Sequence, residues 1–282
     1  MTTINAASSA VEQVTPPQSA TGAGTQWLRR SGQFWYLVAL IGQIAFVVFI
    51  VMFYGTRTFG GDFAGWNDKP IVVGHVEGDA MGNFMFITHV FGATIISLGG
   101  MLQLLPVVRQ RAPAFHRWLG RSFMVMALLM ALGGIMMTWL RGEVEHLVGA
   151  VALTIDGVLI VIFASIAWRL AAAGRIMAHS RWALRTFMVA NAVWFLRLMM
   201  MGWAISTGGW GLEGGLGAPA FLVMQFACYL LPLVVLELYF IAQDSSSEMT
   251  KRVVAGVIVG SSIYMAVGVI GAQSFMWGPY YL

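Results

Sequence analysis

The sequence has one cysteine and few charged residues, and both scarcities exclude classes of protein. With Cys228 as its only cysteine, the chain cannot form an intramolecular disulfide or hold an iron–sulfur cluster on cysteine ligands. Only 10% of the 282 residues are charged, whereas 59% are hydrophobic. A water-soluble protein of this length could not bury so much apolar surface, but a protein dissolved in lipid has no need to. The composition therefore predicts a polytopic membrane protein.

Short segments of alternating polar and apolar residues, which build membrane β-barrels, are also absent, so helices are the expected spanning elements. Seven apolar stretches are each long enough to cross about 30 Å of hydrocarbon as a helix. They run roughly over Tyr36–Tyr54, Asn83–Leu105, Trp118–Leu140, Leu147–Leu170, Trp182–Ser206, Ala218–Ala242 and Val253–Phe275. We expect an all-α fold of seven transmembrane helices around a central four-helix bundle. Residues 1–30 are predicted to be a disordered cytoplasmic tail, and residues 31–282 the transmembrane domain.

Basic residues lie mainly at one end of the predicted helices. In chain order, this end has Arg29 and Arg30, then Arg109, Arg111, Arg117 and Arg121, then Arg169, Arg175, Arg181 and Arg185, then Lys251 and Arg252. The opposite loops have only Arg57, Lys69 and Arg141. Since cytoplasmic loops are enriched in Lys and Arg, we predict a cytoplasmic amino terminus and an external carboxyl terminus. Basic residues that flank apolar stretches indicate contact with the lipid bilayer and not with nucleic acid.

The longest external loop, about residues 55–82, is rich in glycine and in acidic residues. Its titratable residues include Asp62, Asp68, His75, Glu77 and Asp79. We interpret it as a solvated loop, with a weak external site for a cation or a partner as the alternative.

Four histidines occur at alternating ends of four consecutive stretches. His89 and His146 fall toward the external side, and His116 and His179 toward the cytoplasmic side. Histidine is a common ligand of metals and haem, and facing histidines in a four-helix bundle can hold haem between helices. We therefore predict that His116 and His179 ligate one haem iron. His89 and His146 are the candidate ligands of a second haem on the external side. His89 lies inside its stretch and needs a partner, whereas His146 lies at the membrane edge, where water can solvate it.

Each cytoplasmic histidine begins a similar motif, HRWLGR over residues 116–121 and HSRWALR over residues 179–185. Arginine binds carboxylates and phosphates bidentately. Arg117, Arg121, Arg181 and Arg185 are therefore candidates for binding haem propionates. The alternative is that these arginines and tryptophans anchor the helix starts to lipid phosphates, as they commonly do at this depth.

Three charged residues fall inside predicted helices and need partners. Asp156 and Arg197 occur at similar depths in neighbouring stretches, so we predict a structural ion pair between them. Glu237 is level with Arg181 and Arg185 and is expected to pair with one of them. A proton path through these carboxylates is the functional alternative.

The HRWLGR and HSRWALR motifs, together with His89, Gln103, Arg109 and Arg197, resemble a bacterial family of membrane proteins of unknown function over about residues 83–200. This resemblance implies a place in the bacterial inner membrane and no established activity. The alternating histidines are also distantly similar to the transmembrane ascorbate-dependent b-type cytochromes. In that family the second and fourth spans, and the third and fifth spans, hold two haems, which implies haem b here.

Three functions remain open on the sequence. The first is a b-type cytochrome-like electron-transfer protein or quinone-linked oxidoreductase subunit, with haem b, a quinone as a further candidate, and a membrane redox partner. The second is a small haem-free transporter with a polar route through Asp156, Arg197, Glu237 and His89, although paired broken helices are not evident. The third is a haem-free accessory or lipid-binding subunit of a larger membrane complex.

Overall fold

The computed structural model describes residues 22–69, 73–141 and 146–281, and these residues form helices and connecting turns without any strand. Six helical stretches within the described ranges are long and apolar enough to cross a membrane. They are Ala23–Gly60, Ala80–Gln103, Pro113–Leu140, Leu147–Ala172, Pro219–Asp244 and Glu248–Tyr280. The prediction of an all-α membrane protein is confirmed.

Four of the six stretches contain a π-helical segment. The first is α1 (Ala23–Phe49), a π-helix over Ile50–Gly55 and α2 (Thr56–Gly60); the second is α3 (Ala80–Thr94), a π-helix over Ile95–Gly99 and α4 (Gly100–Gln103). After the short α5 (Pro106–Arg111), α6 (Pro113–Met136) and α11 (Glu248–Gly271) end in π-helices over Met137–Arg141 and Ala272–Trp277. The remaining two are α7 (Leu147–Ala172) and α10 (Pro219–Asp244). Because π-helical turns occur often at functional sites, their positions are informative.

The predicted continuous helix over Trp182–Ser206 is wrong, because the chain bends by 55° between α8 (Ile176–Ala190) and α9 (Ala192–Thr207). The bend is at Asn191, which is buried. Its side-chain amide donates to the carbonyl of Phe187 at 2.8 Å and accepts from Nε2 of Gln43 in α1 at 2.8 Å. A side chain that bonds a carbonyl one turn back competes with the helical ladder, which accounts for the break.

Helix α1 begins at Ala23, so the predicted boundary of the tail at residue 30 is wrong for the described part of the chain. The first turn of α1 is tied to the first turn of α11. Gly24 N donates to the Glu248 carboxylate at 2.5 Å, and Lys251 Nζ donates to Thr25 Oγ1 at 3.0 Å. Residues 1–21, the rest of the predicted tail, lie outside the described residues.

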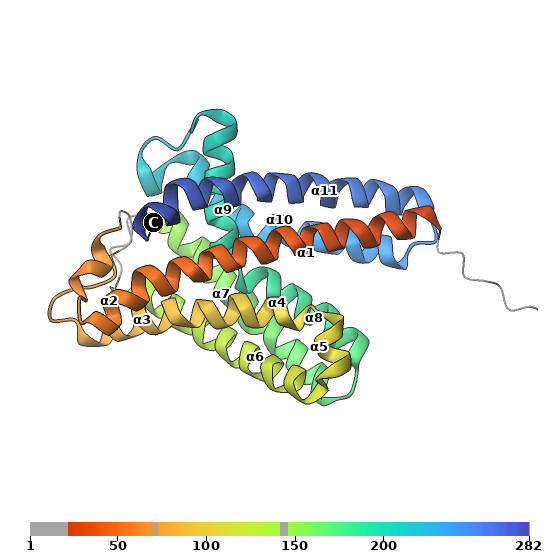
Figure 1. Ribbon diagram of the computed structural model, residues 1–282, viewed down its shortest axis with the longest axis horizontal. Coiled ribbons are helices and arrows are strands. Elements are labelled where there is room, and N and C mark those ends of the chain that lie inside the picture. Colours follow the sequence, from red (N-terminus) through yellow and green to blue (C-terminus); the bar gives the residue numbers. More distant parts are fainter. Residues whose placement is uncertain (1–21, 70–72, 142–145, 282) are drawn as a thin grey trace, which may run out of the picture.

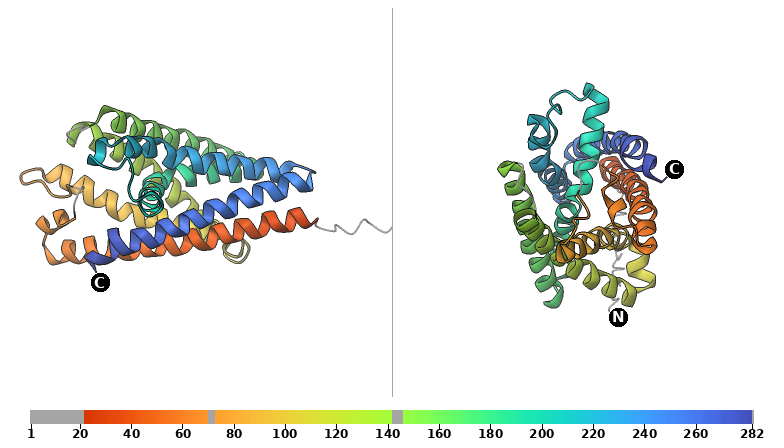
Figure 2. Two further views of the ribbon diagram at one scale, coloured as in Figure 1. Left: turned by 90° about the horizontal axis from the view of Figure 1, so that it is seen from above. Right: turned by 90° about the vertical axis from the view of Figure 1, so that its left-hand side faces the viewer.

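Helices α1 and α11 run side by side over most of their length, as both views in Figures 1 and 2 show. Helix α9 crosses steeply against α11 and α10 (Figure 1). The crossing is close because Gly268 of α11 faces the backbone of Leu198 in α9, and a side chain at residue 268 would collide with it. The main buried cluster includes Phe46 of α1 and Trp277 beyond α11. The core is thus shared with helices outside the four histidine-bearing stretches.

Candidate functional site

Helices α6 and α8 meet through two stacked rings, with the Phe123 and Phe187 centroids 6.4 Å apart. His116 lies seven residues before Phe123, which places it two turns away on the same face of α6. His179 lies eight residues before Phe187 in α8. Both histidines therefore lie about two turns before the ring contact, at the starts of their helices, and the charge of His179 acts on His116.

The two imidazoles have different surroundings. Nδ1 of His179 lies 2.9 Å from the carbonyl oxygen of Ala167 in α7. Nδ1 of His116 is buried and has no hydrogen-bond partner within the described structure. Gln103 Nε2 donates to the His116 carbonyl at 2.8 Å and so fixes the start of α6 against the end of α4. At neutral pH both rings retain a nitrogen that could bind a metal.

Two of the four predicted propionate-binding arginines are already paired with carboxylates of α10. Arg185 binds Glu237 through two hydrogen bonds of 2.6 and 2.8 Å, which confirms the expected pairing of Glu237. Arg181 binds Asp244 through two hydrogen bonds of 2.9 and 2.5 Å. These bidentate pairs tie α8 to the carboxyl-terminal end of α10. Both guanidinium groups are thus engaged by carboxylates, and the binding of haem propionates by Arg181 and Arg185 stays a prediction.

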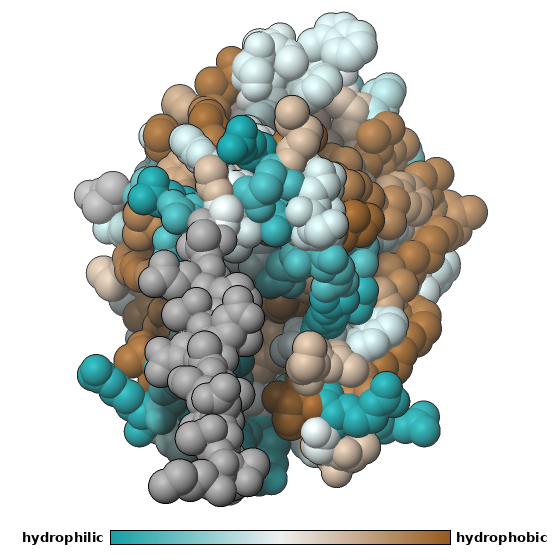
Figure 3. Space-filling view, turned by 90° about the vertical axis from the view of Figure 1, so that its right-hand side faces the viewer, coloured by the Kyte–Doolittle hydropathy of each residue, from teal (hydrophilic) through white to brown (hydrophobic). Residues whose placement is uncertain are grey.

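The other two arginines, Arg117 and Arg121, are exposed on α6. Figure 3 shows the end of the molecule that carries these helix starts, where polar side chains gather and apolar surface lies at the flank. This distribution suits a surface that meets water and lipid headgroups at its end and lipid chains around it.

His89 and His146 are not brought to a common space. The His89 ring packs against Gly134 of α6 and lines a cavity of about 450 Å³ in the half of the molecule that we predict to be external. His146 is exposed at the start of α7, with its ring against Gly217 in the loop before α10, and it does not line that cavity. The expected external pair of haem ligands is thus not assembled.

Asp156 and Arg197 both line this cavity, which we call the external-half cavity, but they do not form the predicted ion pair. Among the described residues, Oδ1 of Asp156 has no hydrogen-bond partner. Arg197 donates to the carbonyl of Val193 at 3.0 Å, and its guanidinium lies over the ring of Phe46 at 5.2 Å from the centroid. Similar depth along the helices was not sufficient to predict an ion pair, because the Arg197 guanidinium packs over Phe46 and not against Asp156.

The cavity is lined by a second cation, Lys69, which belongs to the loop that we expected to be solvated. Lys69 is 8% exposed, and its ammonium lies 4.5 Å from the centroid of the Phe49 ring. Burial first, and the charge of Arg197 second, lower the pKa of Lys69 from its usual 10.5 to about 7. The only indication in the sequence that Lys69 is unusual is that it is one of two lysines in the chain.

Helical irregularities surround the external-half cavity. Asn191, at the break between α8 and α9, is on its wall, as are residues of three π-helical segments, Tyr54, Ser97 and Thr138. The break could have been suspected from an asparagine inside an apolar stretch. The arrangement provides buried polar groups at a depth where a regular helix would present none.

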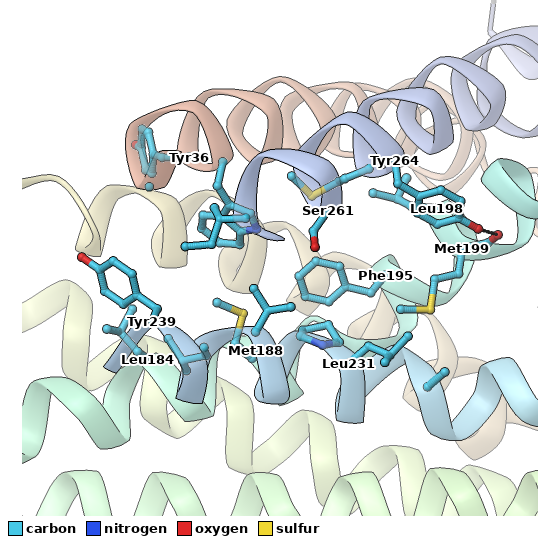
Figure 4. Close-up of a pocket in the computed structure, with 18 of the residues that line it drawn as sticks. Tyr36, Leu184, Met188, Phe195, Leu198, Met199, Leu231, Tyr239, Ser261 and Tyr264 are labelled. Carbon is cyan, nitrogen blue, oxygen red and sulfur yellow. Dashed lines mark hydrogen bonds between the residues drawn. The ribbon is translucent and has the colours of Figure 1, made fainter. Parts of the chain in front are cut away.

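A second, larger space is an apolar groove of about 1550 Å³ that runs between α10 on one side and α1 and α11 on the other. Figure 4 shows side chains of α8, α9, α10 and α11 pointing into it, among them Met188, Phe195, Leu231 and Ser261. Tyr36 and Tyr239 lie at one end. A groove of this volume, lined mainly by apolar side chains, suits an extended apolar molecule.

Comparison with known proteins places the chain in a family. Residues 86–240, more than half of the chain, match the family described as "Predicted membrane protein (DUF2306)", and the chain belongs to this family. No curated protein and no solved structure matches the sequence. The family match confirms the expected resemblance to membrane proteins of unknown function.

Proposed function

We propose that the protein is an integral-membrane electron-transfer protein that binds one b-type haem between His116 and His179. The observation that supports this most is the approach of the two histidines at the starts of α6 and α8, which are in contact through Phe123 and Phe187. Two imidazoles on facing helices are a common axial ligand set for haem. Bound haem would supply one-electron transfer, with its potential set by its ligands and burial.

The surroundings of His179 suit a metal ligand. Its Nδ1 lies 2.9 Å from the Ala167 carbonyl, so a proton on Nδ1 leaves Nε2 free. Metal-bound histidines usually donate their other ring N–H to a carbonyl or carboxylate in this way. Gly100 packs closely against the Phe187 ring, and a side chain at residue 100 would collide with it. The exposed Arg117 and Arg121 remain as candidates to bind the propionates.

We infer a topology of seven spans in the bacterial inner membrane, with a cytoplasmic amino terminus and an external carboxyl terminus. This requires α8 and α9 to cross the membrane together as one broken span. The inference is supported by the twelve basic residues of the cytoplasmic loops against three in the external loops. A reporter enzyme fused after Leu282 should be active only outside the cytoplasm, and cytoplasmic activity there would contradict the topology.

A quinone or lipid in the apolar groove is the second element of the proposal. The groove is about 1550 Å³, and an isoprenoid or acyl chain would bury its apolar surface against α9, α10 and α11. A quinone would also provide a redox partner dissolved in the membrane. If haem is absent, the same groove favours the haem-free lipid-binding subunit as the function.

The decisive experiment is the visible absorption spectrum of protein purified after expression with an adequate haem supply. A low-spin bis-histidine haem should give a Soret band and, after reduction with dithionite, a sharp α-band. The haem content, measured as the pyridine adduct, should be one per chain, because His89 and His146 do not face one space. Purified protein without any Soret band would contradict the proposal.

A further inference from the structure

The external-half cavity is lined by two cations, the buried Lys69 and the partly exposed Arg197, that have no counter-ion among the described residues. Lys69 is 8% exposed, and no carboxylate among the described residues lies within ion-pair distance of either Lys69 or Arg197. Removing an ammonium or guanidinium from water is costly unless a negative charge or several acceptors replace the water. Among the described residues, the one acceptor of Arg197 is the Val193 carbonyl, which occupies only part of its guanidinium.

Both cations are held by the same aromatic wall. Lys69 Nζ lies 4.5 Å from the centroid of Phe49, and the Arg197 guanidinium lies 5.2 Å from the centroid of Phe46. The two rings are stacked on α1, with centroids 6.5 Å apart. Cation–π contact compensates a buried cation by only about 0.5–2 kcal/mol, which is less than an ion pair supplies. The wall therefore positions the two charges side by side without neutralising them.

The other polar groups of the cavity do not neutralise the cations either. Asp156 is 6% exposed, and its Oδ1 has no partner within the described structure. Even with Asp156 ionised, two cations and one carboxylate leave a net positive charge. Nδ1 of His89 is likewise without a partner, so the cavity also offers an unused hydrogen-bonding group.

Most of the cavity wall is apolar. Besides the aromatic wall, it includes Phe86, Ile96, Met130, Ile160 and Trp194. A volume of about 450 Å³ is in the range of small-molecule sites, which are typically apolar with a few convergent polar groups. A small hydrated ion would not fill this space, whereas an organic molecule with a charged end would.

We propose that the external-half cavity binds a monocarboxylate with an apolar body, whose carboxylate lies between Lys69 and Arg197. The apolar body packs against the aromatic wall and the side chains of α3, α6 and α7. One negative charge matches the net charge of the cavity, and the ligand's apolar part matches its walls. This site is separate from the proposed haem site at the starts of α6 and α8, and its test does not depend on haem.

The test measures binding of 3-phenylpropionate to the full-length, detergent-solubilised protein by calorimetry and by the shift in thermal midpoint. Three related compounds separate the contributions. Phenethylamine has the ring and an amine but no carboxylate, phenylalanine has the carboxylate with an added ammonium, and propionate has the carboxylate without the ring. We expect saturable binding of 3-phenylpropionate, weaker binding of propionate and phenylalanine, and none of phenethylamine.

Variants show whether binding occurs in this cavity. Lys69→Met and Arg197→Met should each weaken binding of 3-phenylpropionate by about tenfold to a hundredfold, as expected for the loss of a charge-assisted hydrogen bond. Lys69→Arg, which keeps the charge, should restore most of the affinity. Lys251→Met, which removes the other lysine at the opposite end of the molecule, should bind as the wild type does.

A readout without ligand separates a binding role from a structural one. Since Lys69 has no counter-ion in the described part of the chain, Lys69→Met should unfold at the same temperature as the wild type or at a higher one. The proposal would be overturned if 3-phenylpropionate gave no saturable shift, if Lys69→Met bound it as tightly as Lys251→Met, or if phenethylamine or phenylalanine bound more tightly. A Lys69→Met protein that lost stability without ligand and kept its affinity would also overturn it.

Discussion

Nδ1 of His179 lies 2.9 Å from the carbonyl oxygen of Ala167, so the first turn of α8 is tied to the last turns of α7. This contact fixes the rotation of the imidazole and leaves Nε2 as the free nitrogen when Nδ1 carries the proton. His116 has no comparable partner for Nδ1 within the described residues. If both rings bind iron, the bond to Ala167 makes His179 the better oriented ligand.

We therefore predict that His179→Ala and His116→Ala each abolish the reduced α-band of the purified protein. His146→Ala is the matched control, because His146 is exposed and packs against Gly217 at the other end of the helices. It should retain the wild-type spectrum and haem content. A full α-band in His179→Ala, with unchanged haem content, would rule out His179 as a ligand.

Asp156→Asn should not lower the stability of the protein. Asp156 forms no ion pair with Arg197, and its Oδ1 has no partner, so replacing the carboxyl by an amide of the same shape removes no stabilising interaction within the described structure. Asp244→Asn is the comparison, because Asp244 binds Arg181 bidentately at the surface. That change should lower the thermal midpoint slightly, because it removes a bidentate pair that solvent already screens. Thermal midpoints in one detergent measure both, and a clear loss in Asp156→Asn would restore the ion-pair interpretation.

The Glu237–Arg185 and Asp156–Arg197 pairs together show which ion pairs the sequence can predict. The pairing of Glu237 with Arg185 followed from their similar depth near the ends of their helices, where long side chains can reach one another. Asp156 and Arg197 also have similar depths, but their contact depends on how each helix is rotated about its axis. The 55° bend at Asn191 also changes the direction of α9, which carries Arg197, and the distance of a residue from the end of an apolar stretch does not reveal that bend.

The burial of Lys69 was even less predictable, because it depends on the fold of an irregular loop. Arg57 pairs with Asp68 at 3.0 Å, next to Lys69 in the chain. Asn67 bonds the backbone of Gly74 and His75, which closes the loop on itself. These contacts direct Lys69 toward α1. The spanning helices, by contrast, follow from length and hydrophobicity alone, since lipid requires every backbone group to be bonded within the helix.

Gly268→Ala should destabilise the protein by about 1–3 kcal/mol, the usual cost of overpacking a tight contact. A Cβ atom there would collide with the backbone and side chain of Leu198, where α11 crosses α9. Gly256→Ala is the matched control on the same helix, because a Cβ atom at residue 256 meets nothing within 4 Å. That change should be neutral or slightly stabilising, since alanine favours helix more than glycine does. Equal thermal midpoints for the two variants would contradict the close crossing.

The amount by which the buried Lys69 ammonium lowers the free energy of unfolding should depend on pH. Burial, and then the charge of Arg197, lower the pKa of Lys69 from 10.5 to about 7. Between these two values the unfolded chain carries a proton on Lys69 that the folded protein does not. The free energy of unfolding therefore rises with pH across this window. Below about pH 7 both states are protonated, and the folded protein bears the full cost of a buried ammonium, a few kcal/mol at most.

Lys69→Met removes this cost, so its stability advantage over the wild type should be largest below about pH 7 and should disappear toward about pH 10. Thermal midpoints of the two proteins, measured without ligand across this range, give the difference directly. Lys251→Met controls for the general effect of pH on the solubilised protein. A difference that grew as the pH rose would mean that the folded protein holds the proton on Lys69 more tightly than the unfolded chain does. Lys69 would then have a negatively charged partner in the folded state, and the external-half cavity would have no unpaired cation at that position.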